Sequence, residues 1–177
     1  RHCMVQARGE QFAYEDGTPY SPFGTTAYAL IHQTEELIDQ TMDSLSKAPF
    51  NKIRFCVFPK SYDYNHNEPQ WYAFEKDADG NWDVHSPCLA FWDALEDRIR
   101  ELDRMGIEAD LILFHPYDRW GFDALPQKDN LVYLDYVIRR LSAFPNIWWS
   151  LANEYDISSK SLEDWEEIEE FVAANDS

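Results

Sequence analysis

The chain has 177 residues, of which 45% are hydrophobic and 16% aromatic, so it can bury one sizeable core and is not expected to be disordered. Its formal net charge of -18 at pH 7 argues against a nucleic-acid partner, because phosphate binding depends on Lys and Arg side chains. No apolar run is long enough to cross a membrane, and three cysteines without a CxxC spacing indicate neither a disulfide framework nor a zinc site.

The amino-terminal residues are expected to link the domain to a preceding region of the protein. Residues 1–11 are interpreted as a linker from a preceding region, and residues 12–177 as the domain itself. The opening residues lack the apolar stretch of a signal peptide and do not begin with Met, so we expect a fragment that starts inside a longer protein. No feature assigns a cellular location, although the cytoplasm is slightly favoured.

The first predicted elements are a hairpin, a strand and a helix. A hairpin over residues 12–20, with Asp16-Gly17 at its turn, precedes a short apolar strand at residues 23–27. Thr34 is expected to cap a helix that stops at Pro49. The apolar stripe of that helix should consist of Leu37, Ile38, Met42 and Leu45.

Strands and helices continue to alternate after this helix. A second strand is predicted at residues 52–58, and residues 59–88 are interpreted as a long loop, a feature that is usually functional in a compact domain. Apolar spacing and capping residues predict the rest: a helix from Ser86-Pro87 to Gly106, a strand at 107–114, a helix at 131–143, a strand at 147–151, and a last helix that opens with a Ser161–Asp164 capping box. Four such strand–helix units indicate an α/β fold with a parallel sheet.

Polar residues follow three of the predicted strands. His32-Gln33 comes after the first strand, residues 115–118 after the third, and Asn153-Glu154 after the fourth. In parallel α/β architectures the ligand site lies at the carboxyl ends of the strands. We therefore expect these side chains to gather at one site.

Strand alternation predicts which side chains face inward. In the fourth strand the bulky residues alternate with Ser150 and Ala152, which places Glu154 at the mouth of the inner face. In the second strand the same rule turns Ile53, Phe55 and Val57 towards the helices, and Arg54, Cys56 and Phe58 inward. Because an unpaired buried guanidinium is costly, a carboxylate is the expected partner of Arg54.

Long stretches of the chain resemble a known family. They are SPFGTTAYALIHQ, APFNKIRFCVFPKSYDYNHNEP, GIEADLILFHPYDRWGF and IWWSLANEYD, which look like apiosidase-like glycoside hydrolases, relatives of the clan that includes family 5. The resemblance covers nearly the whole chain. It implies a (β/α)8 TIM barrel, of which the chain supplies only the first four or so βα units, a partial barrel.

The resemblance also implies roles for individual residues. Glu154 corresponds to the clan's acid/base, and Asn153 to the Asn that contacts the sugar 2-hydroxyl. Arg54 corresponds to an Arg that clan members carry on the second strand, and His115 to a His that often follows the third strand. The clan's nucleophile is a Glu that ends the seventh strand, which lies outside this chain. Retaining glycosidases need both carboxylates, about 5–5.5 Å apart, so the fragment alone is expected to be inactive.

The predicted function is retaining hydrolysis of an O-glycosidic bond in a plant-type or other polysaccharide or oligosaccharide. Tyr117, Asp118 and Trp120 follow His115 and offer the rings and hydrogen-bonding groups that sugars require. No cofactor and no metal are expected. The expected partners are a carbohydrate substrate and the remainder of the barrel, or a second copy of the chain; no nucleic acid and no membrane.

Two other classes of function stay open. A non-catalytic carbohydrate-binding module would keep the aromatic residues and half of the catalytic pair. A metal-dependent barrel hydrolase would use His115 and Asp118 as ligands, but Thr25-Thr26-Ala27 supplies no His-x-His pair on the first strand. Each site residue also has a structural interpretation: a solvated loop residue for Glu154, a turn cap for Asn153, an ion-pair residue for Arg54, a core histidine for His115, and packing for Tyr117, Asp118 and Trp120.

Overall fold

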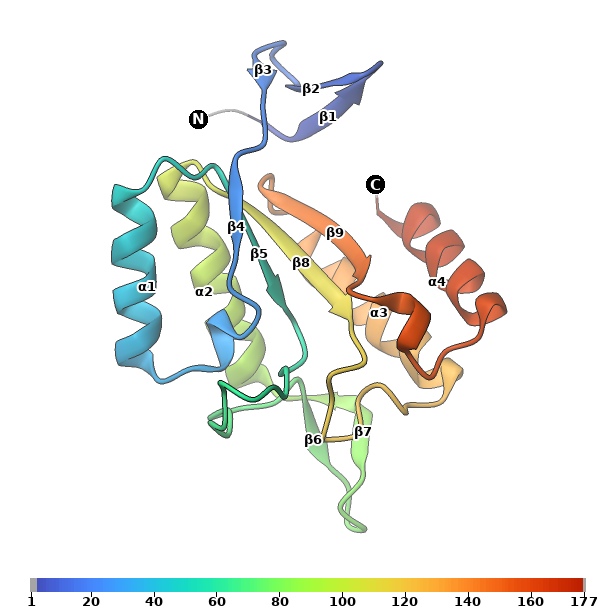
Figure 1. Cartoon of the computed structure of the whole chain (residues 1–177). Helices are drawn as coiled ribbons and strands as arrows, with labels where there is room; N and C mark the ends of the chain where they lie inside the picture. The colour runs from blue at the N-terminus through green and yellow to red at the C-terminus, as the bar shows by residue number, and fades with distance from the viewer. Residues whose placement is uncertain (1–2, 177) are drawn as a thin grey trace.

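The computed structural model describes residues 3–176. Its centre is a parallel sheet in which the strands follow one another in chain order: β4 (Gly24–Thr26), β5 (Lys52–Cys56), β8 (Glu108–Phe114) and β9 (Ile147–Ala152). Helices connect successive strands and lie along one side of the sheet (Figure 1). The fold is therefore a partial barrel of four βα units, with β4 and β9 as the outer strands of the described sheet.

Helical segments alternate with these strands, and two of the helices begin at predicted side-chain caps. The helical segments are η1 (Leu30–His32), α1 (Glu35–Lys47), α2 (Leu89–Met105), α3 (Gln127–Leu141), η2 (Tyr155–Ile157) and α4 (Leu162–Asn175). Thr34 accepts from the backbone of Leu37 at the start of α1, and Ser161 with Asp164 forms the predicted capping box of α4. Gly106 ends α2 in the left-handed region that glycine adopts without strain. Helix α3 begins four residues earlier than predicted.

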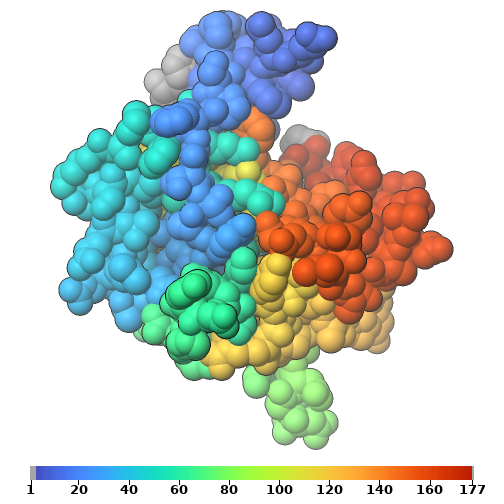
Figure 2. Space-filling model, in the orientation of Figure 1, coloured from blue at the N-terminus to red at the C-terminus, as the bar shows by residue number. Residues whose placement is uncertain are grey.

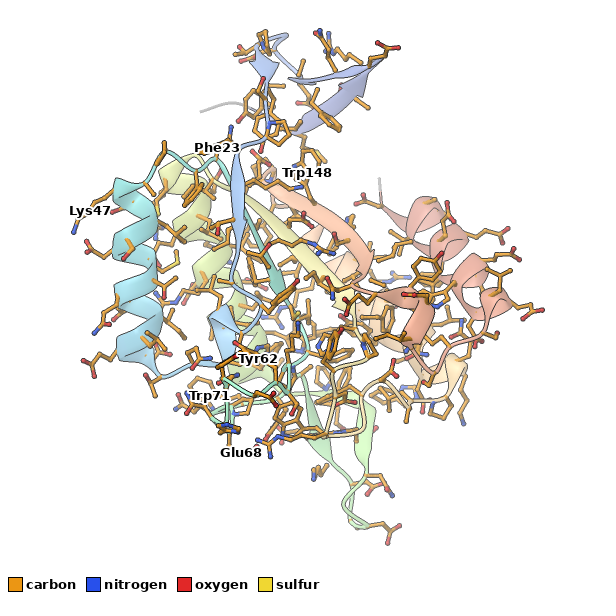
Figure 3. All side chains as sticks on the ribbon, in the orientation of Figure 1. Phe23, Lys47, Tyr62, Glu68, Trp71 and Trp148 are labelled. Atoms are coloured by element: carbon orange, nitrogen blue, oxygen red, sulfur yellow. The ribbon has the colours of Figure 1, made fainter. Side chains whose placement is uncertain are left out.

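A small antiparallel sheet precedes the barrel strands. It contains β1 (Val5–Arg8), β2 (Gln11–Tyr14) and β3 (Pro19–Tyr20), so the predicted hairpin is confirmed. The segment 1–11 had been interpreted as a linker, but residues 5–8 pair with β2 and belong to this sheet. Figure 3 shows Trp148 at the end of the barrel strands beneath it, where its ring contacts Phe12 and Tyr20.

The predicted loop of residues 59–88 contains a second hairpin. Strands β6 (Phe74–Lys76) and β7 (Trp82–Pro87) pair at the carboxyl ends of the barrel strands (Figure 1). The aromatic residues of this segment explain its order, because Trp82 stacks on Phe122 with ring centroids 4.6 Å apart. Part of the predicted long loop is therefore an ordered β-hairpin beside the carboxyl ends of the strands.

The hydrophobic core lies between the sheet and the helices. Ile53 and Phe55 are fully buried in it, as the alternation of β5 predicts, and Val57, just after the strand, is fully buried as well. Phe58 was predicted to face inward, but its ring lies 4.5 Å from those of Phe122 and Tyr133 in the same core. The reason is that β5 ends at Cys56, so alternation no longer applies beyond it.

One residue of the predicted stripe of α1 lies outside the core. Ile38, Met42 and Leu45 are buried, whereas Leu37 is 43% exposed. Within residues 3–176, no helix combines the length and the hydropathy that crossing a bilayer requires.

Candidate active site

Glu154 lies directly after β9, at the carboxyl end of the sheet. Asn153 still pairs with β8 through a 3.1 Å hydrogen bond from its backbone N to Phe114 O, and the chain then turns sharply. Glu154 makes this turn with φ 55° and ψ 57°, the one non-glycine residue with positive φ among residues 3–176. A left-handed backbone costs an ordinary residue about 1–2 kcal/mol, and such outliers cluster at functional sites. The turn leaves the Glu154 side chain exposed at the strand end.

Arg54 faces inward, as strand alternation predicts. Its guanidinium donates to Ser150 Oγ at 3.4 Å, to Asn153 Oδ1 at 3.0 Å and to the carbonyl oxygen of Ala152 at 3.2 Å. The expected carboxylate partner is not found among the described residues, and these three neutral oxygens take its place. Arg54 therefore fixes the end of β9 immediately before Glu154.

The Asn153 side chain is held from two sides. Its Oδ1 accepts from Arg54 Nη1 and, at 3.4 Å, from the hydroxyl of Tyr28. Because the oxygen is used in this way, the amide nitrogen Nδ2 is turned away from Arg54, and it has no hydrogen-bond partner within residues 3–176. One oriented donor is thus available beside Glu154.

Lys60 also belongs to this cluster and was not among the predicted site residues. Its Nζ lies 3.6 Å from the centre of the Tyr28 ring, 4.3 Å from that of Tyr117 and 5.6 Å from that of Tyr62. The sequence did contain a signal: Lys60 follows β5 by four residues, just as the other candidates follow their strands. Applying the strand-end rule to the second strand would have found it.

His115 is buried, with 4% of its surface exposed. Its Nε2 lies 3.1 Å from the carbonyl oxygen of Phe58, which ties the end of β8 to the chain after β5. Burial lowers the pKa of His115 and favours the neutral ring. Its Nδ1 is buried without a partner in the described part of the chain.

The residues after His115 divide into two groups. Tyr117 lies in the cluster with Lys60, and its carbonyl oxygen accepts from Ser61 N at 2.8 Å. Asp118 instead makes contacts within its own loop, and Trp120 contacts the loop between β5 and β6. Asp118 accepts from the backbone N of Trp120 and of Asp123, while Trp120 Nε1 donates to Glu68 at 2.9 Å. Figure 3 labels Glu68, which lies in the loop between β5 and β6.

These contacts bear on the metal-hydrolase alternative. Both carboxylate oxygens of Asp118 already accept backbone hydrogen bonds, and Nε2 of His115 already contacts a carbonyl oxygen. Among residues 3–176, no group of three or more His, Cys, Asp and Glu side chains is placed to hold a metal ion.

The site lies on the open inner face of the sheet. In Figure 2, atoms of β5 and β8 are visible between the segments of β4 and β9. A carboxylate, an amide and a guanidinium lie together with tyrosine rings at the carboxyl ends of the strands, the end of a barrel where active sites are found. The fold thus defines the class: a partial (β/α)8 barrel.

The comparisons identify the family. The family described as apiosidase-like, catalytic domain, matches residues 6–177, so the chain belongs to it. A candidate glycoside hydrolase from Bacteroides vulgatus is 47% identical with a TM-score of 0.95, over 99% of this chain and 37% of that one. Comparison with curated proteins gave no match.

More distant structures share the fold alone. A family 5 glycoside hydrolase from Bacteroides vulgatus is 15% identical with a TM-score of 0.71, over 99% of this chain and 38% of that one. An endo-1,4-beta-mannanase from Rhizomucor miehei is 18% identical with a TM-score of 0.68, over 97% of this chain and 57% of that one. The chain therefore spans 37–38% of the length of the two Bacteroides proteins.

Proposed function

We propose that the chain is the first half of the catalytic barrel of a retaining glycoside hydrolase, with Glu154 as its acid/base. The observation that carries this proposal is the end of β9, where Arg54 and Tyr28 hold Asn153 and the backbone turn presents Glu154. An exposed loop glutamate would need neither the strained turn nor the fixed neighbour. Membership of the apiosidase-like family supports the same role.

Glu154 would act twice in the reaction. It first protonates the glycosidic oxygen as the bond to the leaving group breaks, while a second carboxylate attacks the anomeric carbon. That carboxylate belongs to the remainder of the barrel. In the second step Glu154 takes a proton from water, which attacks the glycosyl-enzyme intermediate and releases a sugar with its original anomeric configuration.

The other predicted residues would bind the sugar in different ways. Asn153 would donate through its available amide nitrogen to the hydroxyl beside the anomeric carbon. The rings of Tyr117 and Trp120 suit the apolar face of a sugar. His115 would contribute beside them, and its Nδ1 is the ring nitrogen without a hydrogen-bond partner in residues 3–176. Asp118 would shape the loop that carries Trp120. The proposed substrate is an O-glycoside of a plant-type or other polysaccharide or oligosaccharide.

The test is hydrolysis by the complete protein, followed from the first seconds by proton NMR. We expect turnover of a glycoside and a first-formed product with the anomeric configuration of the substrate. Release of the opposite anomer would contradict the retaining mechanism. Saturable sugar binding with no turnover would instead indicate a carbohydrate-binding module.

A further inference from the structure

The backbone turn at Glu154 continues directly into the short helix η2. Glu154 O accepts from Ile157 N at 3.3 Å, and the helix ends at Ser158, so one uninterrupted turn connects the left-handed residue to Ser158. A non-glycine residue keeps a left-handed backbone only where the surrounding structure holds the chain in place. Hydrogen bonds to the Asn153 side chain hold the entry to this turn. The turn also needs an anchor at its exit, at Ser158 and the residues that follow.

The carboxylate of Asp123, from the loop between β8 and α3, is this anchor. Its Oδ1 accepts from Ser158 Oγ at 2.7 Å, and its Oδ2 accepts from the backbone N of Ser159 at 3.1 Å. Lys160 Nζ donates to the same Oδ1 at 3.3 Å, and the Lys160 side chain is only 3% exposed. Burial by itself raises the pKa of Asp123, but these hydrogen bonds and the lysine charge lower it below its usual value. One charged carboxylate thus holds three consecutive residues after η2.

The backbone of Asp123 adds further contacts to the same unit. Its carbonyl oxygen accepts from Ser159 Oγ at 2.6 Å and from Lys160 Nζ at 3.2 Å. Its backbone N donates to Asp118 Oδ2 at 2.7 Å, and Asp118 Oδ1 accepts from Trp120 N at 2.8 Å. The anchor is therefore fixed within its own loop. The loop after β8 and the loop after β9 form one hydrogen-bonded unit around Asp123.

We infer that Asp123 is a positioning residue for the proposed acid/base: its carboxylate holds the exit of the turn that presents Glu154, while Asn153 holds the entry. The inference rests on the proposed function of Glu154. A general acid must lie within hydrogen-bond reach of the oxygen that it protonates, so a displaced turn affects proton transfer in particular. Asp123 itself transfers no proton and touches no reacting atom in this role.

The test is kcat/KM of the complete protein carrying Asp123→Asn, measured on two glycosides of the same sugar, one with a poor and one with an activated leaving group. Asn keeps the shape of the side chain but removes its charge and one acceptor. On the poor leaving group we expect a loss of roughly tenfold to a hundredfold, the effect of a small displacement of a catalytic group. The activated substrate needs no proton and should lose less than about threefold. The matched control is Asp135→Asn, which removes a carboxylate paired with Arg139 on α3 and should change neither value.

The outcomes separate this inference from the proposed function. Equal losses on both substrates, or no loss, in a folded Asp123→Asn protein would overturn the inference, because a purely structural contact affects both substrates alike. If Asp123→Asn fails to fold, Ser158→Ala removes only the hydroxyl that donates to Oδ1, and the same comparison decides. A selective loss in Glu154→Gln without one in Asp123→Asn would overturn the inference alone. Equal and small losses in Glu154→Gln would overturn the proposed function itself.

Discussion

At the carboxyl end of β9, the position of a single guanidinium determines how the site is arranged. Arg54 reaches across from β5 and donates to Ala152 O and Asn153 Oδ1, two consecutive residues of the neighbouring strand end. A charged donor with several acceptors forms stronger and better oriented hydrogen bonds than a neutral one. The Asn153 amide and the turn at Glu154 are therefore fixed before a substrate arrives.

Replacing Arg54 by Met should remove this orientation while keeping the length of the side chain. In the complete protein we expect kcat/KM to fall by about two orders of magnitude, because misplacing a catalytic group by about 1 Å has an effect of that size. Circular dichroism should show a folded protein. The control is Arg139→Met, which removes an exposed arginine of α3. Near wild-type turnover of Arg54→Met would mean that its contacts are structural only.

The residues of the site were predictable to different degrees. Alternation along β5 predicted the inward direction of Arg54, because direction follows from strand geometry alone. Its partners within residues 3–176 are neutral oxygens and not the expected carboxylate, because a backbone carbonyl and an amide oxygen also accept hydrogen bonds and residue types do not reveal them. The loop contacts of Asp118 and Trp120 depend on Asp123 and Glu68, whose positions sequence spacing does not indicate.

At the level of elements, the opposite end of the sheet carries a buried polar cluster. Glu108 at the start of β8 is buried, and its carboxylate accepts from Trp148 Nε1 at 3.2 Å. Lys52 pairs with Asp110 at 2.8 Å and lies 4.1 Å from the centre of the Trp148 ring. Burial raises the pKa of Glu108 to about 7. In barrels this end usually serves stability rather than catalysis.

This cluster predicts how stability depends on pH. Because the pKa of Glu108 is higher in the folded state than in the unfolded state, the folded state holds an extra proton between pH 4.5 and 7. Stability should therefore fall as pH rises through this window, by on the order of 2 kcal/mol. Thermal unfolding of the wild type and Glu108→Gln at pH 5 and 8 measures the difference.

Glu108→Gln should remove this part of the dependence, since the amide does not titrate. Glu169→Gln, at an exposed position of α4, should leave it unchanged. An identical pH dependence in the wild type and Glu108→Gln would show that the carboxyl group is not protonated in the folded protein.

The elements themselves were predicted more reliably than their surroundings. Capping residues and apolar spacing gave the barrel strands and helices, because both are local properties of the chain. The hairpin β6–β7 was missed, since its order depends on Trp82 packing against Phe122, forty residues further along the chain. The strand β1 was missed for a similar reason, because its residues are mostly exposed and show no apolar pattern.

At the scale of the whole molecule, the central strand β8 of the parallel sheet is buried and its outer strand β9 is partly exposed. Every residue of β8 is buried, whereas every residue of β9 is partly exposed. Large apolar side chains are also exposed around the end of β9: Tyr155, Ile157 and Leu162. Unpaired strand edges and exposed apolar patches promote association with other chains. We therefore propose that the remainder of the barrel, or a second copy of the chain, covers this side.

The 177-residue chain alone should show the consequence of these open edges. We expect size-exclusion chromatography with light scattering to reveal dimers or aggregates, or binding of a complementary half, rather than a stable monomer. A panel of chromogenic glycosides should show no turnover. A monomer with measurable turnover would contradict the account, because it would require a second catalytic carboxylate within the chain, with Asp118 the first to examine.

The role of Glu154 is tested most directly by Glu154→Gln in the complete protein, which keeps the shape of the side chain and removes its proton. On substrates with poor leaving groups, kcat/KM should fall by about two to four orders of magnitude, the usual contribution of general acid–base catalysis. Substrates with activated leaving groups should lose less in the first step, because they need no proton. Glu163→Gln, an exposed glutamate of α4, serves as the control. Equal and small losses on both kinds of substrate would contradict the assignment of Glu154 as the acid/base.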